Sequence, residues 1–136
     1  MAAENDAKKT ELTAKTALCL AAITMVGIDG DFKDDELNKL RYLAQDDDTA
    51  FVNAFEIYNW RTVDECIDLV SQKLSEAQKR LVCKILYDYA TVDREFHPTE
   101  QELLKQYGEK FGFSEKTMKE ICEERVKTED LSIFNA

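Results

Sequence analysis

The sequence predicts an all-α fold, a single compact domain of about seven helices spanning residues 1–136. The chain has 136 residues, the size of one ordinary domain, and no proline- or serine-rich linker divides it. It contains only 4 Gly and 1 Pro, which favours helices over many short strands joined by turns. Apolar residues recur at helical spacing along most of the chain, and no alternating strand pattern competes with them.

Four helices are expected in the first half of the chain. Residues 8–25 form the first, and because it is apolar nearly all round it should lie at the centre of the fold. Residues 34–44 and 49–58 carry apolar residues three and four positions apart, which predicts two further helices. Thr62 and Glu65 form a capping box, whose hydroxyl and carboxylate accept hydrogen bonds from free amides, and this opens the fourth.

Three more helices follow in the second half. Ser75 and Gln78 open the fifth in the same way, and it is again apolar on most sides. Pro98, a residue favoured at the first helical position, begins the sixth, and Gly112 ends it. Ser114 caps the seventh. The boundaries of all seven helices are therefore readable from helical periodicity and capping residues.

The cysteines and the C-terminal tail are expected to belong to the core. Each cysteine falls on an apolar helical stripe and none forms a C-x-x-C pair, so we expect reduced thiols in a cytoplasmic protein rather than disulfides or zinc ligands. The tail 131–134 is apolar enough to dock back onto the helices. The four cysteines are Cys19, Cys66, Cys83 and Cys122.

The net charge of −10 excludes several classes of partner. Nucleic acid and anionic membrane surfaces are not expected, because binding them needs clustered Lys and Arg. No secretory signal or membrane-inserting segment is visible. Between residues 29 and 65 there are 11 acidic against 4 basic residues, a net of −7. This region is a solvated face, or else it meets cations or a basic protein partner; the oligomeric state is not predicted.

An acidic helix–turn–helix occurs twice, in repeat halves at about residues 12–45 and 76–111. Residues 28–36 align with residues 92–100 at an offset of 64 without a gap. Each copy follows a strongly apolar helix and precedes an amphipathic one, which predicts a pseudo-twofold helical core. The carboxylates matched by the repeat are Asp29 with Asp93, Asp31 with Glu95, and Glu36 with Glu100.

Two interpretations of these turns stay open. Aspartate is common where a helix ends, and a Glu at the third position of the next helix meets free amides, so the motif can be purely structural. Alternatively, the twofold brings the two turns together, and like carboxylates then repel unless a cation bridges them. Six oxygen donors suit Ca²⁺, Mg²⁺ or Mn²⁺. An EF-hand is excluded, because its required Gly and Glu positions hold Asp34 and Leu40 in the first copy, and Pro98 and Leu104 in the second.

The duplicated turn resembles the TerB-like superfamily, which includes the tellurite-resistance protein TerB and the N-terminal domain of DnaJ-like membrane co-chaperones. The resemblance rests on the acidic turns and on the step Phe111-Gly112-Phe113-Ser114, and it covers residues 16–124. It implies about seven helices and a metal-binding role for Asp29, Asp31, Glu36, Asp93, Glu95 and Glu100. Arg94 replaces the usual Gly in the second copy, and its cation is able to neutralise the cluster in place of a metal. Lys33 replaces the family's usual capping residue.

Other candidates for chemistry are few. His97, the only histidine, lies where it would cap the sixth helix, and no second His or neighbouring Cys supports zinc binding or nucleophilic catalysis. Phe51, Phe55, Tyr58 and Trp60 are expected to pack in the core, with a partner-binding surface as the alternative.

The sequence therefore predicts a non-enzymatic TerB-like module that binds a divalent cation in a stress- or envelope-linked complex. The alternatives are a protein-interaction adaptor whose acidic turns are structural and, more remotely, a carboxylate-dependent hydrolase.

Overall fold

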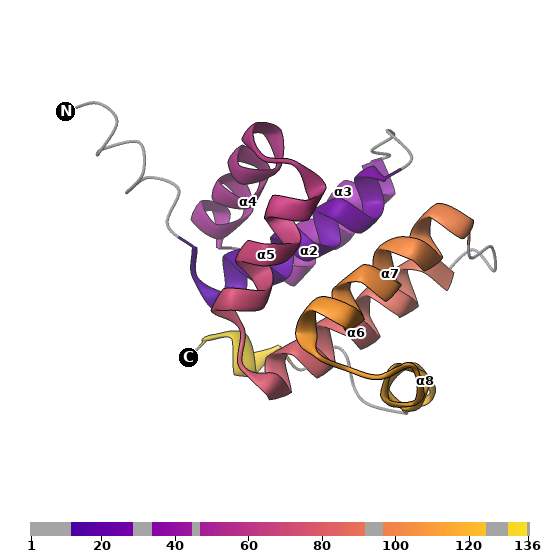
Figure 1. Cartoon of the computed structure of the whole chain (residues 1–136). Coiled ribbons are helices and arrows are strands. Elements are labelled where there is room, and N and C mark those ends of the chain that lie inside the picture. The colour runs from indigo at the N-terminus through magenta and orange to yellow at the C-terminus, as the bar shows by residue number, and fades with distance from the viewer. Residues whose placement is uncertain (1–11, 29–33, 45–46, 92–96, 125–130, 136) are drawn as a thin grey trace.

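The computed structural model describes residues 12–28, 34–44, 47–91, 97–124 and 131–135, except for the side chains of residues 35, 36 and 135. Within these ranges the chain forms seven α-helices and one short 3₁₀ turn, and no strand (Figure 1). This confirms the all-α prediction. The elements are α2 (Ala14–Gly27), α3 (Asp34–Leu43), α4 (Asp48–Trp60), α5 (Val63–Lys73), α6 (Glu76–Thr91), α7 (Pro98–Phe111), α8 (Glu115–Glu123) and η1 (Ser132–Asn135).

Helix α2 is the centre of the fold, as its apolar sequence predicts. Every one of its residues except Lys15 is buried, and it packs against α3, α4, α5, α6, α7 and η1 (Figure 1). The prediction that this helix starts at Lys8 is wrong for the described residues before Ala14, because Leu12 and Thr13 are not helical. The helix begins at Ala14, because Thr13 adopts an extended backbone and its hydroxyl accepts the amide of Thr16 at 3.1 Å. Residues 1–11 lie outside the described residues.

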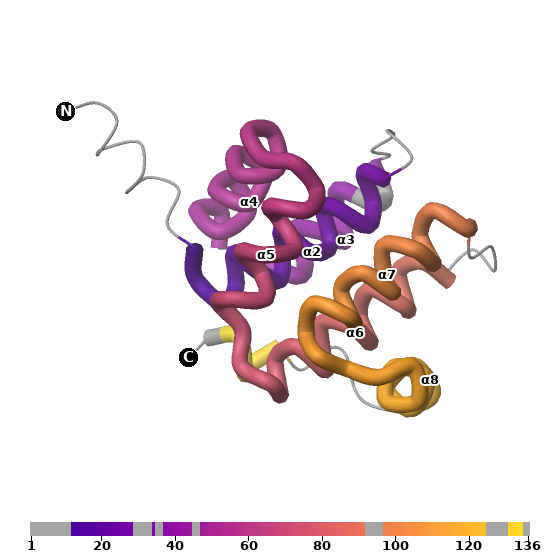
Figure 2. The backbone as a smooth tube through the Cα atoms, in the orientation of Figure 1, coloured from indigo at the N-terminus to yellow at the C-terminus, as the bar shows by residue number. Residues whose placement is uncertain are grey.

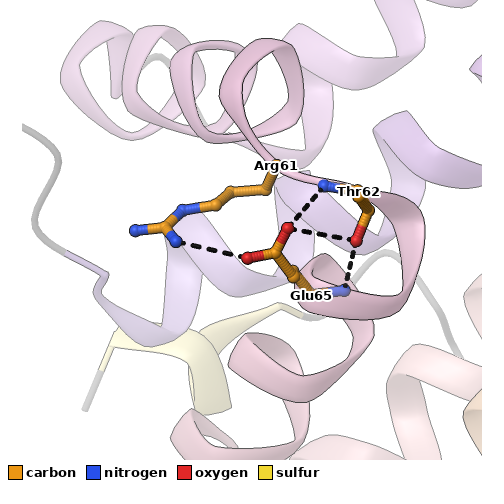
Figure 3. A network of polar contacts seen from close by, with 3 residues as sticks. All are labelled: Arg61, Thr62 and Glu65. Carbon is orange, nitrogen blue, oxygen red and sulfur yellow. Dashed lines mark hydrogen bonds and ion pairs between the residues drawn. The ribbon is translucent and has the colours of Figure 1, made fainter.

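Two capping boxes start α5 and α6 as predicted. In the first, the Thr62 hydroxyl accepts the Glu65 amide at 3.2 Å and the Glu65 carboxylate accepts the Thr62 amide at 3.1 Å (Figure 3). In the second, the Ser75 hydroxyl accepts the Gln78 amide at 3.3 Å and the Gln78 side chain accepts the Ser75 amide at 2.8 Å. Each box satisfies amides that a helix start otherwise leaves without partners.

The step from α7 to α8 also follows the predicted signals. Gly112 has φ of 84°, a left-handed conformation that favours glycine, and it ends α7. The Ser114 hydroxyl then accepts the Thr117 amide at 3.1 Å and starts α8. Within α7, Gly108 lies so close to α8 that a methyl group there would meet the Met118 sulfur at 2.7 Å. The Met118 side chain of α8 therefore occupies the space that a larger residue at position 108 would need.

The C-terminal tail docks back onto the core, as expected from its apolar residues. Leu131 and Phe134 are buried in the same cluster as the helices. The Gln78 side-chain amide donates to the Ile133 carbonyl at 2.6 Å, so a capping residue of α6 also holds the tail in place.

One hydrogen-bond chain crosses the core. The Thr24 hydroxyl of α2 donates to the Ala21 carbonyl at 2.6 Å, and the Tyr107 hydroxyl of α7 lies 2.7 Å from the Thr24 oxygen. Because the single Thr24 proton is used on Ala21, the Tyr107 hydroxyl is the donor in the second bond. The two halves of the repeat are thus joined by a buried polar contact as well as by apolar packing.

Candidate cation site at the paired helical hairpins

The two repeat halves form two helical hairpins, α2 with α3 and α6 with α7. The end of α2, the start of α3, the end of α6 and the start of α7 all lie on the right of Figures 1 and 2. Two hydrogen bonds hold these ends to their neighbours. The Tyr89 hydroxyl, near the end of α6, donates to the Lys39 carbonyl of α3 at 3.1 Å, and the Tyr58 hydroxyl donates to the Gly27 carbonyl at 3.4 Å.

Most of the predicted metal ligands lie outside the described residues. The first two ligands of each copy are among these residues. They include Asp29 and Asp93, whose carboxylate separation tests for a site shared by the two turns. The residues concerned are Asp29, Asp31, Asp93 and Glu95, together with Arg94 and Lys33. Glu36 is the third residue of α3, but its side chain is not among the described ones.

Glu100 is the one predicted ligand whose side chain is described, and it serves the start of α7. Its carboxylate accepts the backbone amide of His97 at 3.1 Å. His97 occupies the cap position and is exposed, as expected, and Pro98 follows as the first helical residue. A carboxylate at this position satisfies an amide and meets the positive end of the helix dipole. The structural interpretation therefore accounts for Glu100.

The described residues contain no group of three or more His, Cys, Asp or Glu side chains arranged to hold a metal ion. The cysteines are unsuited to such a role, since burial raises the pKa of Cys19 and Cys83 to about 12 and that of Cys66 to about 11. At neutral pH these thiols are protonated, whereas metal ligation and nucleophilic attack need the thiolate. Cys122 is half-buried, and all four cysteines are free thiols.

The expectation that the aromatic stretch packs in the core is wrong for Trp60. Phe51, Phe55 and Tyr58 are half-buried against the core, but Trp60 is 84% exposed. The buried face of α4 is set by Ala50, Ala54 and Ile57. Trp60 is the last residue of the helix and lies off that face, and none of the elements that the structure describes covers it.

Two surface hollows appear that the sequence did not indicate. One, of about 250 Å³, lies between α7 and α8 and has an apolar floor that includes Leu104, Phe113 and Met118. The other, of about 360 Å³, lies between α5 and α7 beside the ion pair of Lys110 with Asp68 at 2.6 Å. Neither lining includes a histidine, and the only cysteine, Cys122, has a raised pKa because of burial. Neither hollow therefore holds a Cys–His pair for nucleophilic catalysis.

Comparison with known proteins places the chain by its sequence. The family model described as "Tellurite resistance protein TerB" matches residues 12–123, which run from just before α2 to the end of α8. No curated protein and no solved structure was found to match the chain. None of the helices in the described ranges is long and apolar enough to cross a membrane.

Proposed function

Because this chain belongs to the TerB family, we propose that it is a non-enzymatic module that binds a divalent cation through its duplicated acidic turns, as part of a stress- or envelope-linked complex. The observation that carries the proposal is the pairing of the two hairpins. The helix ends that flank both turns lie on the same side of the molecule (Figure 2). The bond from Tyr89, near the end of α6, to Lys39, in the middle of α3, joins the second hairpin to the first.

The chemistry of the donor set supports a hard cation. The three positions at which both copies carry an acidic residue supply carboxylates alone, and oxygen-only sites suit Ca²⁺, Mg²⁺ or Mn²⁺. The histidine of the repeat, His97, aligns with Lys33 and occupies the cap position of α7. When bound, such an ion would neutralise carboxylates that otherwise repel one another. Arg94 competes for this role, because its guanidinium already supplies one positive charge within the second turn.

The six carboxylates divide into two roles under this proposal. Glu100 spends an oxygen on the His97 amide, and the gapless repeat gives Glu36 the same third position of its helix. These two glutamates orient the helix starts. The aspartates and the remaining glutamate are the ligands that face the ion: Asp29, Asp31, Asp93 and Glu95.

Calorimetry and thermal melting of the chelator-treated protein test this function. A cation that binds only the folded state stabilises it by about 2.7 kcal/mol when its concentration is 100 times Kd, so Ca²⁺, Mg²⁺ or Mn²⁺ should raise the melting temperature. The D29N/D93N variant should lose this gain. The control E102Q/E120Q removes the same charge from two exposed positions outside the turns and should keep it.

Two results would contradict the cation role. One is an unchanged melting temperature of the native protein at millimolar concentrations of all three ions. The other is a D29N/D93N variant that melts lower by the same amount with chelator and with cation, because that outcome makes the aspartates structural.

Replacing Arg94 with Gly should tighten cation binding if the guanidinium occupies the place of the ion.

A further inference from the structure

One face of α4 carries four residues at a spacing of four: Asp48, Val52, Glu56 and Trp60. Residues four apart lie one above the other on a helix, so acidic and apolar side chains alternate along this line. Val52 is 51% exposed, Trp60 is 84% exposed and Asp48 is exposed, while Glu56 is half-buried. We call these four residues the Trp60 face. Its two large apolar side chains face solvent on a helix whose other side is already packed.

The backbone that carries Trp60 is fixed on both sides. The Arg61 amide donates to the Ile57 carbonyl at 3.0 Å and closes α4. The next residue, Thr62, starts α5 through its capping box with Glu65, and the Arg61 guanidinium lies 3.4 Å from the Glu65 carboxylate (Figure 3). An aromatic side chain held on a rigid corner loses little backbone entropy when it is covered, which is the property of an interface anchor.

The charge around this face selects the kind of partner. Residues 47–68, which run from α4 into α5, contain six acidic residues and one basic residue, Arg61. The Arg41 guanidinium of α3 also lies 5.5 Å from the centre of the Phe51 ring of α4, so acidic groups still outnumber basic ones here. A second copy of the chain would bring two net charges of −10 together, and an anionic membrane surface would be repelled in the same way. A basic segment of another protein is attracted, since opposite potentials speed encounter and favour the complementary partner.

We propose that the Trp60 face is the docking surface for a basic amphipathic helix of a partner protein. Apolar side chains of the partner cover Val52 and Trp60, and its Lys or Arg residues meet Asp48 and Glu56. Two helices pack side by side when rows of side chains at four-residue spacing on each interdigitate, and the Trp60 face supplies one such row. This surface lies on α4 and uses none of the repeat carboxylates, so it is independent of the proposed cation site.

The chain contains one tryptophan, which makes Trp60 its own reporter. The probe is an 18-residue Leu/Lys amphipathic helix without Trp or Tyr, and the control probe carries Glu at every Lys position. Added to the protein in chelator, the Leu/Lys peptide should shift the Trp60 emission to shorter wavelength, and the affinity should fall as salt is raised. The Leu/Glu peptide should give no shift. An unshifted emission at millimolar Leu/Lys peptide, or an equal shift with the Leu/Glu peptide, overturns the proposal.

Substitutions test whether the peptide binds the Trp60 face or the acidic surface of the protein in general. Binding is followed by the polarisation of labelled peptide. W60A should weaken it at least tenfold, and Y42A, which removes another exposed aromatic (59% exposed) from α3, should change it less than twofold. D48N/E56Q should weaken binding about fivefold more than E102Q/E120Q. Equal effects of W60A and Y42A, or of the two charge pairs, would show that the peptide binds the acidic surface at large. Because chelator is present, failure here leaves the cation test unaffected.

Discussion

The hydrogen-bond chain from Tyr107 through Thr24 to Ala21 makes a quantitative prediction about the core. Tyr107 is fully buried, and burial raises the pKa of its phenol well above the ordinary value, so it remains a neutral donor. T24V keeps the shape of the side chain but removes the acceptor, leaving the Tyr107 hydroxyl buried without a partner. Y107F removes the donor but leaves the Thr24 hydroxyl bonded to the Ala21 carbonyl.

The two substitutions should therefore differ in cost. A buried polar group without a partner costs about 2 kcal/mol of unfolding free energy, so T24V is expected to lower it by about that amount. Y107F should lower it by about 1 kcal/mol, the net value of an ordinary hydrogen bond. In the T24V/Y107F double variant no polar group is stranded. Its cost should be about 1 kcal/mol, well below the sum of the single variants, because replacing both partners by apolar groups is nearly neutral.

Urea denaturation of the four proteins measures this double-mutant cycle, with a constant m-value as the condition for comparing them. T91V is the matched control, since the Thr91 hydroxyl donates to the Tyr87 carbonyl at 2.8 Å in the same kind of back-bond, but at the end of α6. It should cost less than about 0.5 kcal/mol, the usual range for changes outside the core. Additive single-variant costs, or a T24V cost no larger than that of Y107F, would refute the hydrogen-bond assignment.

Three further predictions concern the helix start of α5, the thiols and the contact of α7 with α8. Hydrogen bonds from the backbone amide and the hydroxyl of Thr62 lower the pKa of Glu65 below its ordinary value of about 4.5. The Glu65 charge therefore stabilises the fold fully at pH values above 4.5, and this stabilisation is lost as the pH falls through the lowered pKa of the folded state. The stability difference between native protein and E65Q, measured by urea denaturation, should accordingly shrink from pH 6 to pH 3, and a difference that does not change with pH would contradict this. Alkylation at pH 8 followed by mass spectrometry should label half-buried Cys122 before buried Cys83, and the reverse order would oppose it. G108A should gain less than alanine's helix advantage of about 1 kcal/mol, because the new methyl meets the Met118 side chain and displaces it, and it should gain more in an M118A background; equal gains in both backgrounds would refute the close contact.

The helices were predictable because their signals are local. A capping box such as Thr62 with Glu65 satisfies its amides within four residues, so it functions wherever the segment lies in the fold. The glycine that ends α7 and the serine that starts α8 act over similarly short distances. The start of the first described helix was missed although Thr13 is itself a local cap, because the apolar period was extended back through polar residues that do not belong to it.

Burial was less predictable, because it depends on which elements pack together. Trp60 is apolar and follows three half-buried aromatic residues, so the sequence suggests that it is buried as well. Its exposure depends on how the chain leaves α4 at Arg61, which the sequence pattern does not reveal. The same limit applies to the contact at Gly108, which is made by the Met118 side chain of α8. Such features follow from contacts between elements distant in sequence, which periodicity alone does not contain.

The repeat shows that a duplicated acidic residue can serve the fold. Its third-position glutamate is matched between the two copies, and in the second copy this residue holds the His97 amide. A residue whose carboxylate accepts a hydrogen bond at a helix start is not identified as a metal ligand merely because it is acidic and duplicated. The two aspartates seven residues earlier, Asp29 and Asp93, lie outside the described residues and precede the helix starts in sequence. If the repeat has a function beyond the fold, Asp29 and Asp93 are therefore the residues at which substitution should separate ion binding from stability, whereas Glu36 and Glu100 should affect stability first.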